Sequence, residues 1–173
     1  MGPVFTTLTA LSIASLSFSG PQDPLILAQS TTQGIATFKL GATDTDGLQA
    51  EDQTPTGRFT TATEVKPILG ATRANWVAVR EYGGQDLVYV THLWAWRCGL
   101  AQMKLSINGT APEIWPLPAC HLDTAQPAAI LESDGLPYRS FALGSVQTIT
   151  VTLIYDDLTR DVATFDRAGT LLP

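Results

Sequence analysis

The sequence predicts an all-β protein, either an antiparallel β-sandwich of immunoglobulin-like architecture or a small barrel, with a long proline-rich loop. Three observations support this prediction. Short runs of β-branched and aromatic residues alternate with turn residues along most of the chain. Two of the turns, Gly83-Gly84 and Asn108-Gly109, are residue pairs that tolerate the positive φ of a tight hairpin. Almost no segment repeats its apolar residues with the helical period.

The composition limits the class of protein. Ten Lys and Arg stand against sixteen Asp and Glu among the 173 residues, which gives a formal net charge of −6, and only 15% of the residues are charged. A nucleic-acid-binding protein would carry a basic excess to neutralise phosphates, so we expect no nucleic-acid partner. The apolar fraction, 45%, is that of an ordinary folded domain.

The N-terminal region predicts export. Residues 1–38 contain one ionisable side chain, Asp23, and the apolar run Val4–Phe18 precedes a Gly-Pro helix breaker. This order is typical of a secretory signal peptide cleaved after Ala28, although no basic residue precedes the run. The alternative is a buried N-terminal segment of the domain. The run is too short and too rich in Ser and Thr for a stable transmembrane span.

We therefore expect a leader at 1–28, a single β-sandwich domain at 29–173, and a periplasmic or extracellular location. The first elements of that domain are a short alternating strand at 35–40 and an acidic loop at 41–56. The Thr-rich residues 58–65 then predict a strand that ends before a proline.

The strongest hairpin signal joins residues 75–82 to residues 87–96 through the Gly-Gly pair. The second of these runs is apolar on both faces, which predicts a central strand covered on both sides. His92, Trp94 and Trp96 would share one face of that strand, and Trp76 would lie on its partner.

Clean alternation predicts further strands at 102–107, 146–155 and 161–165. Five prolines punctuate residues 111–138, which predicts irregular or edge structure because proline cannot donate to a sheet. A loop of this length is unusual in a compact domain unless it is tied down or functional.

Cys98 and Cys120 predict one disulfide, since an even cysteine count in an exported chain favours pairing. The alternatives are two buried thiols or, with His92 and His121, a zinc or copper site. The spacing matches no compact zinc finger, so we expect neither a metal nor another cofactor.

No catalytic constellation is visible in the sequence. There are two histidines, and no serine lies in a Gly-x-Ser-x-Gly frame. Asp156 and Asp157 are neighbours, and we interpret them as turn formers. The prediction is a protein that is not an enzyme. A hydrolase or metal-dependent enzyme, with a site that motifs do not reveal, stays as the alternative.

The tryptophan cluster is the most specific feature. All four tryptophans lie between positions 76 and 115. Cross-strand aromatic pairs stabilise sheets, which is one interpretation of the cluster. The other is a stacking surface for a sugar or a peptide. On that interpretation the binding residues are Trp94, Trp96, Arg97, Trp115, Tyr138 and Arg139. We expect Arg97 and Trp115 to be exposed beside the disulfide.

The predicted function is therefore an exported, non-catalytic binding or accessory module of the periplasm or cell surface. Its expected partner is a protein or a carbohydrate ligand.

Overall fold

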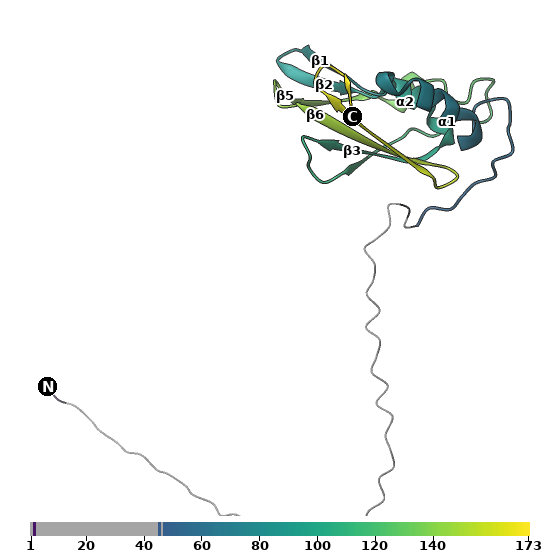
Figure 1. Ribbon diagram of the computed structural model, residues 1–173, viewed down its shortest axis with the longest axis horizontal. Helices are drawn as coiled ribbons and strands as arrows, with labels where there is room; N and C mark the ends of the chain where they lie inside the picture. The colour runs from purple at the N-terminus through teal and green to yellow at the C-terminus, as the bar shows by residue number, and fades with distance from the viewer. Residues whose placement is uncertain (1, 3–44, 46) are drawn as a thin grey trace, which may run out of the picture. The chain divides into compact units, whose positions relative to one another are not determined.

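The computed structural model describes residues 2, 45 and 47–173. The leader expected at 1–28 and the strand expected at 35–40 lie outside these residues. The described chain is mostly strand, arranged in two antiparallel sheets with few helices (Figure 1). The all-β class is confirmed. Among the residues described, no helix is long and apolar enough to cross a membrane.

Within the described residues, eight strands form the two sheets. The smaller sheet has the order β1-β2-β5, and the larger has the order β4-β3-β6-β7-β8. Within the described part of the chain, no strand of one sheet pairs with a strand of the other. The bounds are β1 Ala78–Tyr82, β2 Gln85–Tyr89, β3 Leu100–Ile107, β4 Glu113–Trp115, β5 Tyr138–Ala142, β6 Thr148–Tyr155, β7 Arg160–Asp166 and β8 Leu171–Leu172.

Both predicted glycine turns are confirmed. Gly83 and Gly84 have φ of 58° and 77°, and they connect β1 to β2 with Tyr82 paired to Gln85. Positive φ at both central residues matches the twist of an antiparallel hairpin. Asn108 and Gly109, at φ 53° and 75°, end β3 in the same way.

The helices are short. Two are α-helices and three are 3-10 helices: α1 Ala62–Ala71, α2 Thr91–Ala95, η1 Arg73–Asn75, η2 Arg97–Gly99 and η3 Glu132–Asp134.

The strand expected at 58–65 is wrong, because helix α1 begins at Ala62. The local reason is a set of hydrogen bonds between Glu64, in the first turn of the helix, and the residues that precede the helix. Thr61 and Glu64 stand in the Thr-x-x-Glu frame, and Glu64 accepts hydrogen bonds from the Thr61 hydroxyl and the Thr60 N–H. Val65 and Leu69 are buried at helical spacing, so the helix buries one face.

The long central strand expected at 87–96 is also wrong. Strand β2 ends at Tyr89, and the chain turns into α2. Leu93 and Trp94 are neighbours, and both are buried in the same core. Successive strand residues point to opposite faces, so a helical turn is needed to bring both side chains to one side. Trp94 and Trp96 therefore share no strand face. Trp76, which follows η1, precedes β1 rather than lying on it.

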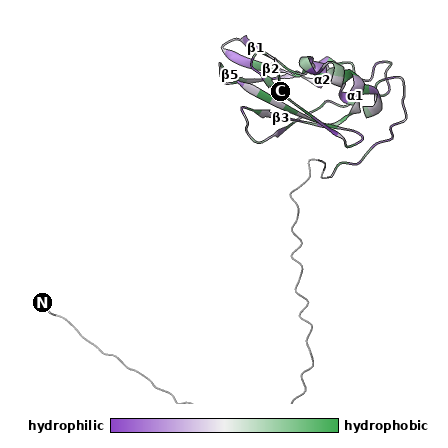
Figure 2. Ribbon diagram, viewed as in Figure 1, coloured by the Kyte–Doolittle hydropathy of each residue, from purple (hydrophilic) through white to green (hydrophobic). Residues whose placement is uncertain are grey.

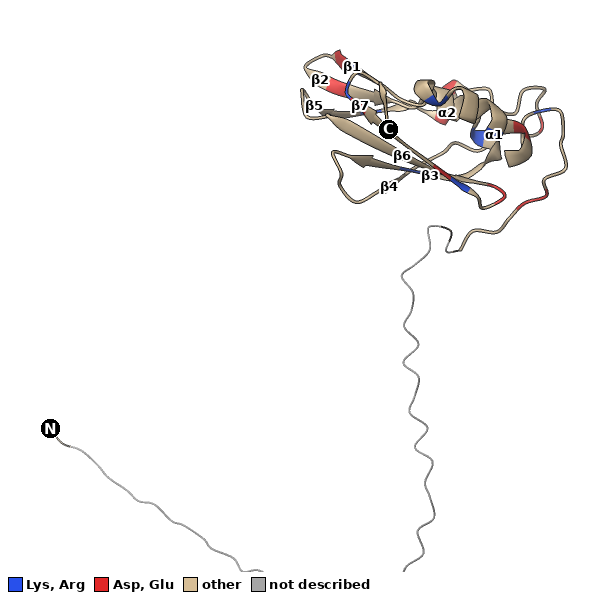
Figure 3. Cartoon of the chain, in the orientation of Figure 1, with Lys and Arg blue, Asp and Glu red and all other residues tan. Residues whose placement is uncertain are grey.

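One hydrophobic core contains buried residues of both sheets and both α-helices, with apolar residues spread over all of these elements (Figure 2). Val88 on β2, Met103 on β3 and Ile149 on β6 are fully buried within it. Lys104 is the one charged residue of β3 and β6 together (Figure 3). The low charge fraction therefore has its origin in strands whose residues are apolar or Thr.

A buried ion pair ties the two sheets together. The carboxylate of Asp86 on β2 is completely buried and accepts two hydrogen bonds, of 2.6 and 2.7 Å, from Arg167 in the β7–β8 turn. The backbone N–H groups of Gly144 and Val146 donate to the same carboxylate. The hydrogen bonds from Arg167 hold the pKa of Asp86 far below its ordinary range. Arg167 also donates to the carboxylate of Glu81 on β1, at 2.5 Å.

The predicted disulfide is confirmed. Cys98 in η2 is bonded to Cys120, and their Cα atoms are 5.7 Å apart. It attaches the segment after β4 to the start of β3.

The hydrogen bonds of the Glu64 carboxylate make the free energy of unfolding depend on pH. Burial alone would raise the pKa of Glu64, but hydrogen bonds from the Thr60 and Gly57 N–H groups and from the Thr56 and Thr61 hydroxyls outweigh it and lower the pKa from 4.5 to about 2. A depressed carboxyl pKa stabilises the folded state above pH 4.5, and this stabilisation is lost as the pH falls towards 2.

We expect Glu64→Gln to lower the free energy of unfolding by about 1 kcal/mol at pH 7, because the neutral amide accepts these hydrogen bonds more weakly than the carboxylate does. The difference from wild type should shrink steadily as the pH falls from 4.5 towards 2. Urea unfolding between pH 7 and pH 2 measures it, with Glu132→Gln as the control. An equal loss at both ends of the pH range contradicts the assignment.

Candidate functional site

Two cavities lie between the edge strands β4 and β5. Trp94 and Tyr138 line a cavity of about 280 Å³. Phe141 lines a second cavity of about 420 Å³. Trp115 and Arg139 line both, so the two cavities are neighbours on either side of this pair. We call them together the β4–β5 cleft.

The two strands run in opposite directions along the cleft. On β4, Glu113 borders the larger cavity and Trp115 borders both, while Pro116 borders the smaller one. On β5 the order is reversed, since Tyr138 borders the smaller cavity and Phe141 the larger. Trp115 and Arg139 therefore lie opposite each other at the middle of the cleft.

The register shows which side chains face the space between the sheets. Arg139 is paired with Val88, a fully buried core residue, and cross-strand partners share a face of the sheet. Phe141 lies two residues further along the same face and packs against the core. On β4, Trp115 is in the core, and Glu113 two residues earlier lies on the same face of the strand, where it is exposed and lines the larger cavity.

Arg139 is the central charge of the cleft. Its guanidinium Cζ lies 4.4 Å from the centroid of the Trp115 ring, within cation–π range. Of the carboxylates in the described chain, none forms an ion pair with Arg139. Trp94 adds a second donor to the same region, because its buried Nε1–H has no hydrogen-bond partner there.

Four of the six residues predicted to bind come together in the cleft: Trp94, Trp115, Tyr138 and Arg139. Tyr138 packs against Tyr89 of the neighbouring strand, with ring centroids 4.9 Å apart and the ring planes tilted by 45°. Trp96 lies elsewhere, edge-to-face against Phe59 at 5.4 Å.

The expected exposure of Arg97 and Trp115 is wrong. Arg97 is 2% exposed and Trp115 is 3% exposed. Trp115 belongs to the core, and its ring is covered by Arg139 on the cleft side. Whether either residue takes part in binding stays a prediction.

Arg97 is a structural anchor within the described residues. Its guanidinium donates to the Asp134 carboxylate, at 3.3 Å, and to backbone carbonyl oxygens at 2.8–3.1 Å. Those carbonyls belong to Trp94, Pro118, Ala119, Ala128 and Ala129. Asp134 also accepts from the Leu131 N–H, which lowers its pKa, with smaller contributions from His121 and Arg97.

The histidines make contacts of an ordinary structural kind. His92 is on α2 rather than on a strand, and its Nε2 lies 2.7 Å from the Thr72 hydroxyl. That hydroxyl donates its only proton to the Ile68 carbonyl, so the imidazole is the donor in the contact. Burial lowers the pKa of His92. His121 Nε2 lies 3.1 Å from Asp134.

Asp156 is more than a turn former. It is 2% exposed, and one carboxylate oxygen accepts from the Ala62 N–H at the start of α1 and from the Gln53 amide, both at 2.8 Å. Burial raises its pKa. Asp157 fits the turn assignment, because it accepts from the Thr159 N–H and hydroxyl, and it also pairs with Lys66. In the part of the chain described, no three His, Cys, Asp or Glu side chains are grouped to hold a metal ion.

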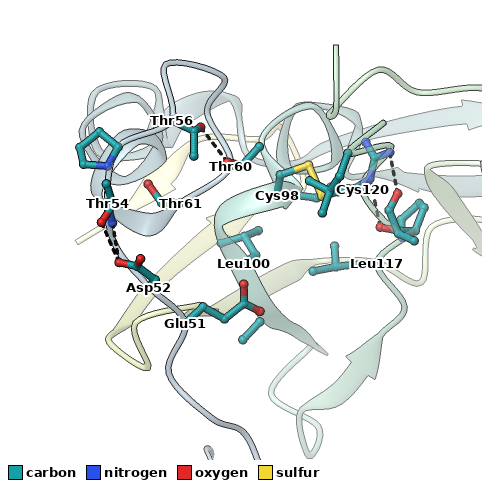
Figure 4. A pocket seen from close by; sticks show the side chains of 16 residues that line it. Glu51, Asp52, Thr54, Thr56, Thr60, Thr61, Cys98, Leu100, Leu117 and Cys120 are labelled. Atoms are coloured by element: carbon teal, nitrogen blue, oxygen red, sulfur yellow. Dashed lines mark hydrogen bonds between the residues drawn. A yellow bond between two sulfur atoms is a disulfide. The ribbon is translucent and has the colours of Figure 1, made fainter. Parts of the chain in front are cut away.

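A separate cavity of about 610 Å³ is larger than either cavity of the β4–β5 cleft (Figure 4). It lies between residues 51–61 and the disulfide, with Leu100 and Leu117 on the disulfide side. Asp52 at its edge already accepts from the N–H and hydroxyl of Thr54. Of the predicted binding residues, Arg97 alone lines this cavity, and its donors are occupied. We therefore favour the β4–β5 cleft.

Three residues near the cleft, Glu113, Asp134 and Phe141, were not predicted from the sequence. Asp134 and Arg97 are far apart in the chain and follow no local pattern, so no sequence signal joins them. Phe141 belongs to β5, a strand that the analysis did not predict. Its alternation, Arg139 and Phe141 inward with Ser140 exposed, was a usable signal.

Comparisons with protein-family models, with curated proteins and with solved structures find no match to this chain.

Arg97→Lys should lower the free energy of unfolding by about 3 kcal/mol or more, because lysine cannot serve five carbonyls and a carboxylate and leaves buried acceptors unpaired. Urea unfolding monitored by tryptophan fluorescence measures the loss. Arg80→Lys, on an exposed arginine of β1, is the matched control. Equal stability of the two variants would show that Arg97 is not the anchor.

Proposed function

We propose that the chain is an exported, non-catalytic binding module of the periplasm or cell surface, and that a protein or carbohydrate ligand binds in the β4–β5 cleft. The observation that carries the proposal is the convergence of Trp94, Trp115, Tyr138 and Arg139 on one cleft. These residues come from α2, β4 and β5, so the fold brings together side chains that lie far apart in the sequence.

The electrostatics of the cleft support binding. Arg139 faces the space between the sheets and has no acidic partner in the described chain. Arginine and aromatic side chains are the residues most enriched at the centres of protein interfaces, because they combine apolar contact area with directed donors. A half-buried guanidinium between two cavities is placed to meet a ligand acceptor.

The architecture proposed with this function is a β-sandwich that is open along one side. The Asp86–Arg167 ion pair joins the sheets near β1. The cleft separates them between β4 and β5. A rigid two-sheet scaffold with one open side suits a module that presents a binding site without large movement.

Export is supported by two independent features. The disulfide between Cys98 and Cys120 is one, because disulfides persist in oxidising compartments. The signal-like apolar run before Ala28 is the other.

We expect the native protein to begin near Gln29 and to have a mass two hydrogens below that of the reduced chain. Intact mass spectrometry of protein from its source measures both, and a cytosolic full-length chain with free thiols would overturn this part.

The geometry of the histidines favours binding over acyl transfer. A Ser-His or Thr-His pair needs the hydroxyl to donate to the imidazole. In the Thr72–His92 pair the hydroxyl donates to a backbone carbonyl instead.

Arg139→Ala should abolish or weaken ligand binding by about tenfold without unfolding the domain, because Arg139 is at the edge of the core. Binding is measured against a glycan array and a peptide library, with Arg80→Ala as the control. Arg80 is also a stacked arginine on an edge strand of the same sheet, at 5.4 Å from the Tyr82 ring. A glycan or a peptide that binds wild type and Arg80→Ala but no longer binds Arg139→Ala supports the site. Ligands that bind both variants as tightly as wild type place the site elsewhere.

A further inference from the structure

We propose that the ligand of the β4–β5 cleft is an extended peptide segment of a partner protein, which adds as an antiparallel strand to the edge of β5. Its acidic side chain faces Arg139, and a basic side chain two residues earlier faces Glu113. This inference rests on the proposed function and names its ligand class.

The edges of the sheets supply the backbone partners. Strand β5 pairs with β2 on one side, and no other described strand pairs with its second side. Strand β4 likewise has β3 as its one neighbour. A strand edge presents a row of N–H and C=O groups, and extended peptides commonly bind by completing it. All the strand pairs in this fold are antiparallel, so we assign that direction to the added strand.

Opposite charges on the two walls supply the specificity. Arg139 on β5 and Glu113 on β4 line the same cavity, and they form no ion pair with each other. Neither residue pairs with any other charge in the described chain. A ligand that carries both signs can satisfy both residues.

The spacing fixes the order of the ligand's charges. Arg139 lies opposite Trp115, while Glu113 lies two residues before Trp115, beside Phe141. Two residues of a strand span about 6.8 Å and point to the same face. A strand antiparallel to β5 passes Phe141 first and Arg139 second. Its inward residues are therefore a basic side chain, whose apolar stem packs on Phe141, and then an acidic one.

The state of the tryptophans favours a peptide over a sugar. Sugar stacking needs an open aromatic face, whereas Trp115 is 3% exposed and covered by Arg139. Trp94, at 4%, is buried as well. The cleft offers a half-buried guanidinium and strand edges that no other described strand pairs with, which match the side chains and the backbone of a peptide.

The test uses a capped heptapeptide with lysine third, glutamate fifth and threonine or serine elsewhere. A second peptide exchanges the lysine and the glutamate, and a third has glutamine at both positions. Titration into isotope-labelled protein is followed by NMR. We expect the first peptide to bind about tenfold or more tightly than the glutamine peptide, as a charge-assisted contact implies. The amide shifts should occur on β5 and β4, with β1 and β8 as internal controls.

The double variant Glu113→Lys with Arg139→Glu should reverse the preference and bind the exchanged peptide about tenfold more tightly than the first. If that variant does not fold, Arg139→Gln alone should remove the preference of wild type for the first peptide. Equal binding of all three peptides, tighter binding of the exchanged peptide by wild type, or no peptide binding overturns the inference. If a glycan shifts the amide signals of β4 and β5 while the peptides do not, the assignment of a peptide ligand is wrong and the proposed function stays in place.

Discussion

The buried guanidinium of Arg97 organises a long segment of the described chain that has little regular structure. Residues 116–137 contain one short 3-10 helix and several prolines, so few of their carbonyl groups have backbone donors. Arg97 donates to four carbonyls of this segment and to Asp134. Burying a charge is unfavourable unless it is paired and hydrogen-bonded, and both conditions are met here. The disulfide at the neighbouring Cys98 holds the same segment, and together they fix one wall of the β4–β5 cleft.

The sequence predicted what local patterns encode and missed what distant contacts decide. Strands with clean alternation, such as β3 and β6, and the two glycine turns were predictable from period and turn chemistry. Helix α2 was not, because an apolar run on both faces fits a buried strand as well as a buried helical turn. Helix α1 was readable from Thr61 and Glu64. In the site, the aromatic residues and Arg139 were found by residue type, whereas the burial of Arg97 depends on carbonyls more than 20 positions away.

The two sheets are held together unequally. Near β1, Arg167 donates hydrogen bonds to Glu81 on β1, to the buried Asp86 on β2 and to the Val146 carbonyl just before β6. At the opposite edges, the contact between the sheets includes the stack of Arg139 on Trp115. A stack of this kind is weaker than a bidentate ion pair, so under the proposed function the cleft side would be the one that adjusts to the ligand. The side held by Arg167 and Asp86 would keep the core intact while the cleft side adjusts.

The inward charges of the cleft also bear on how the protein behaves at high concentration. Unpaired strand edges are common starting points for aggregation, and inward-pointing charges are one way in which natural sheets prevent it. A neutral strand from another copy that entered here would bury Glu113 and Arg139 without partners, which costs several kcal/mol. The edges are therefore open to a segment with matching charges and closed to the apolar strands of an unfolding neighbour. A variant that makes both positions neutral would keep the cleft but lose this protection.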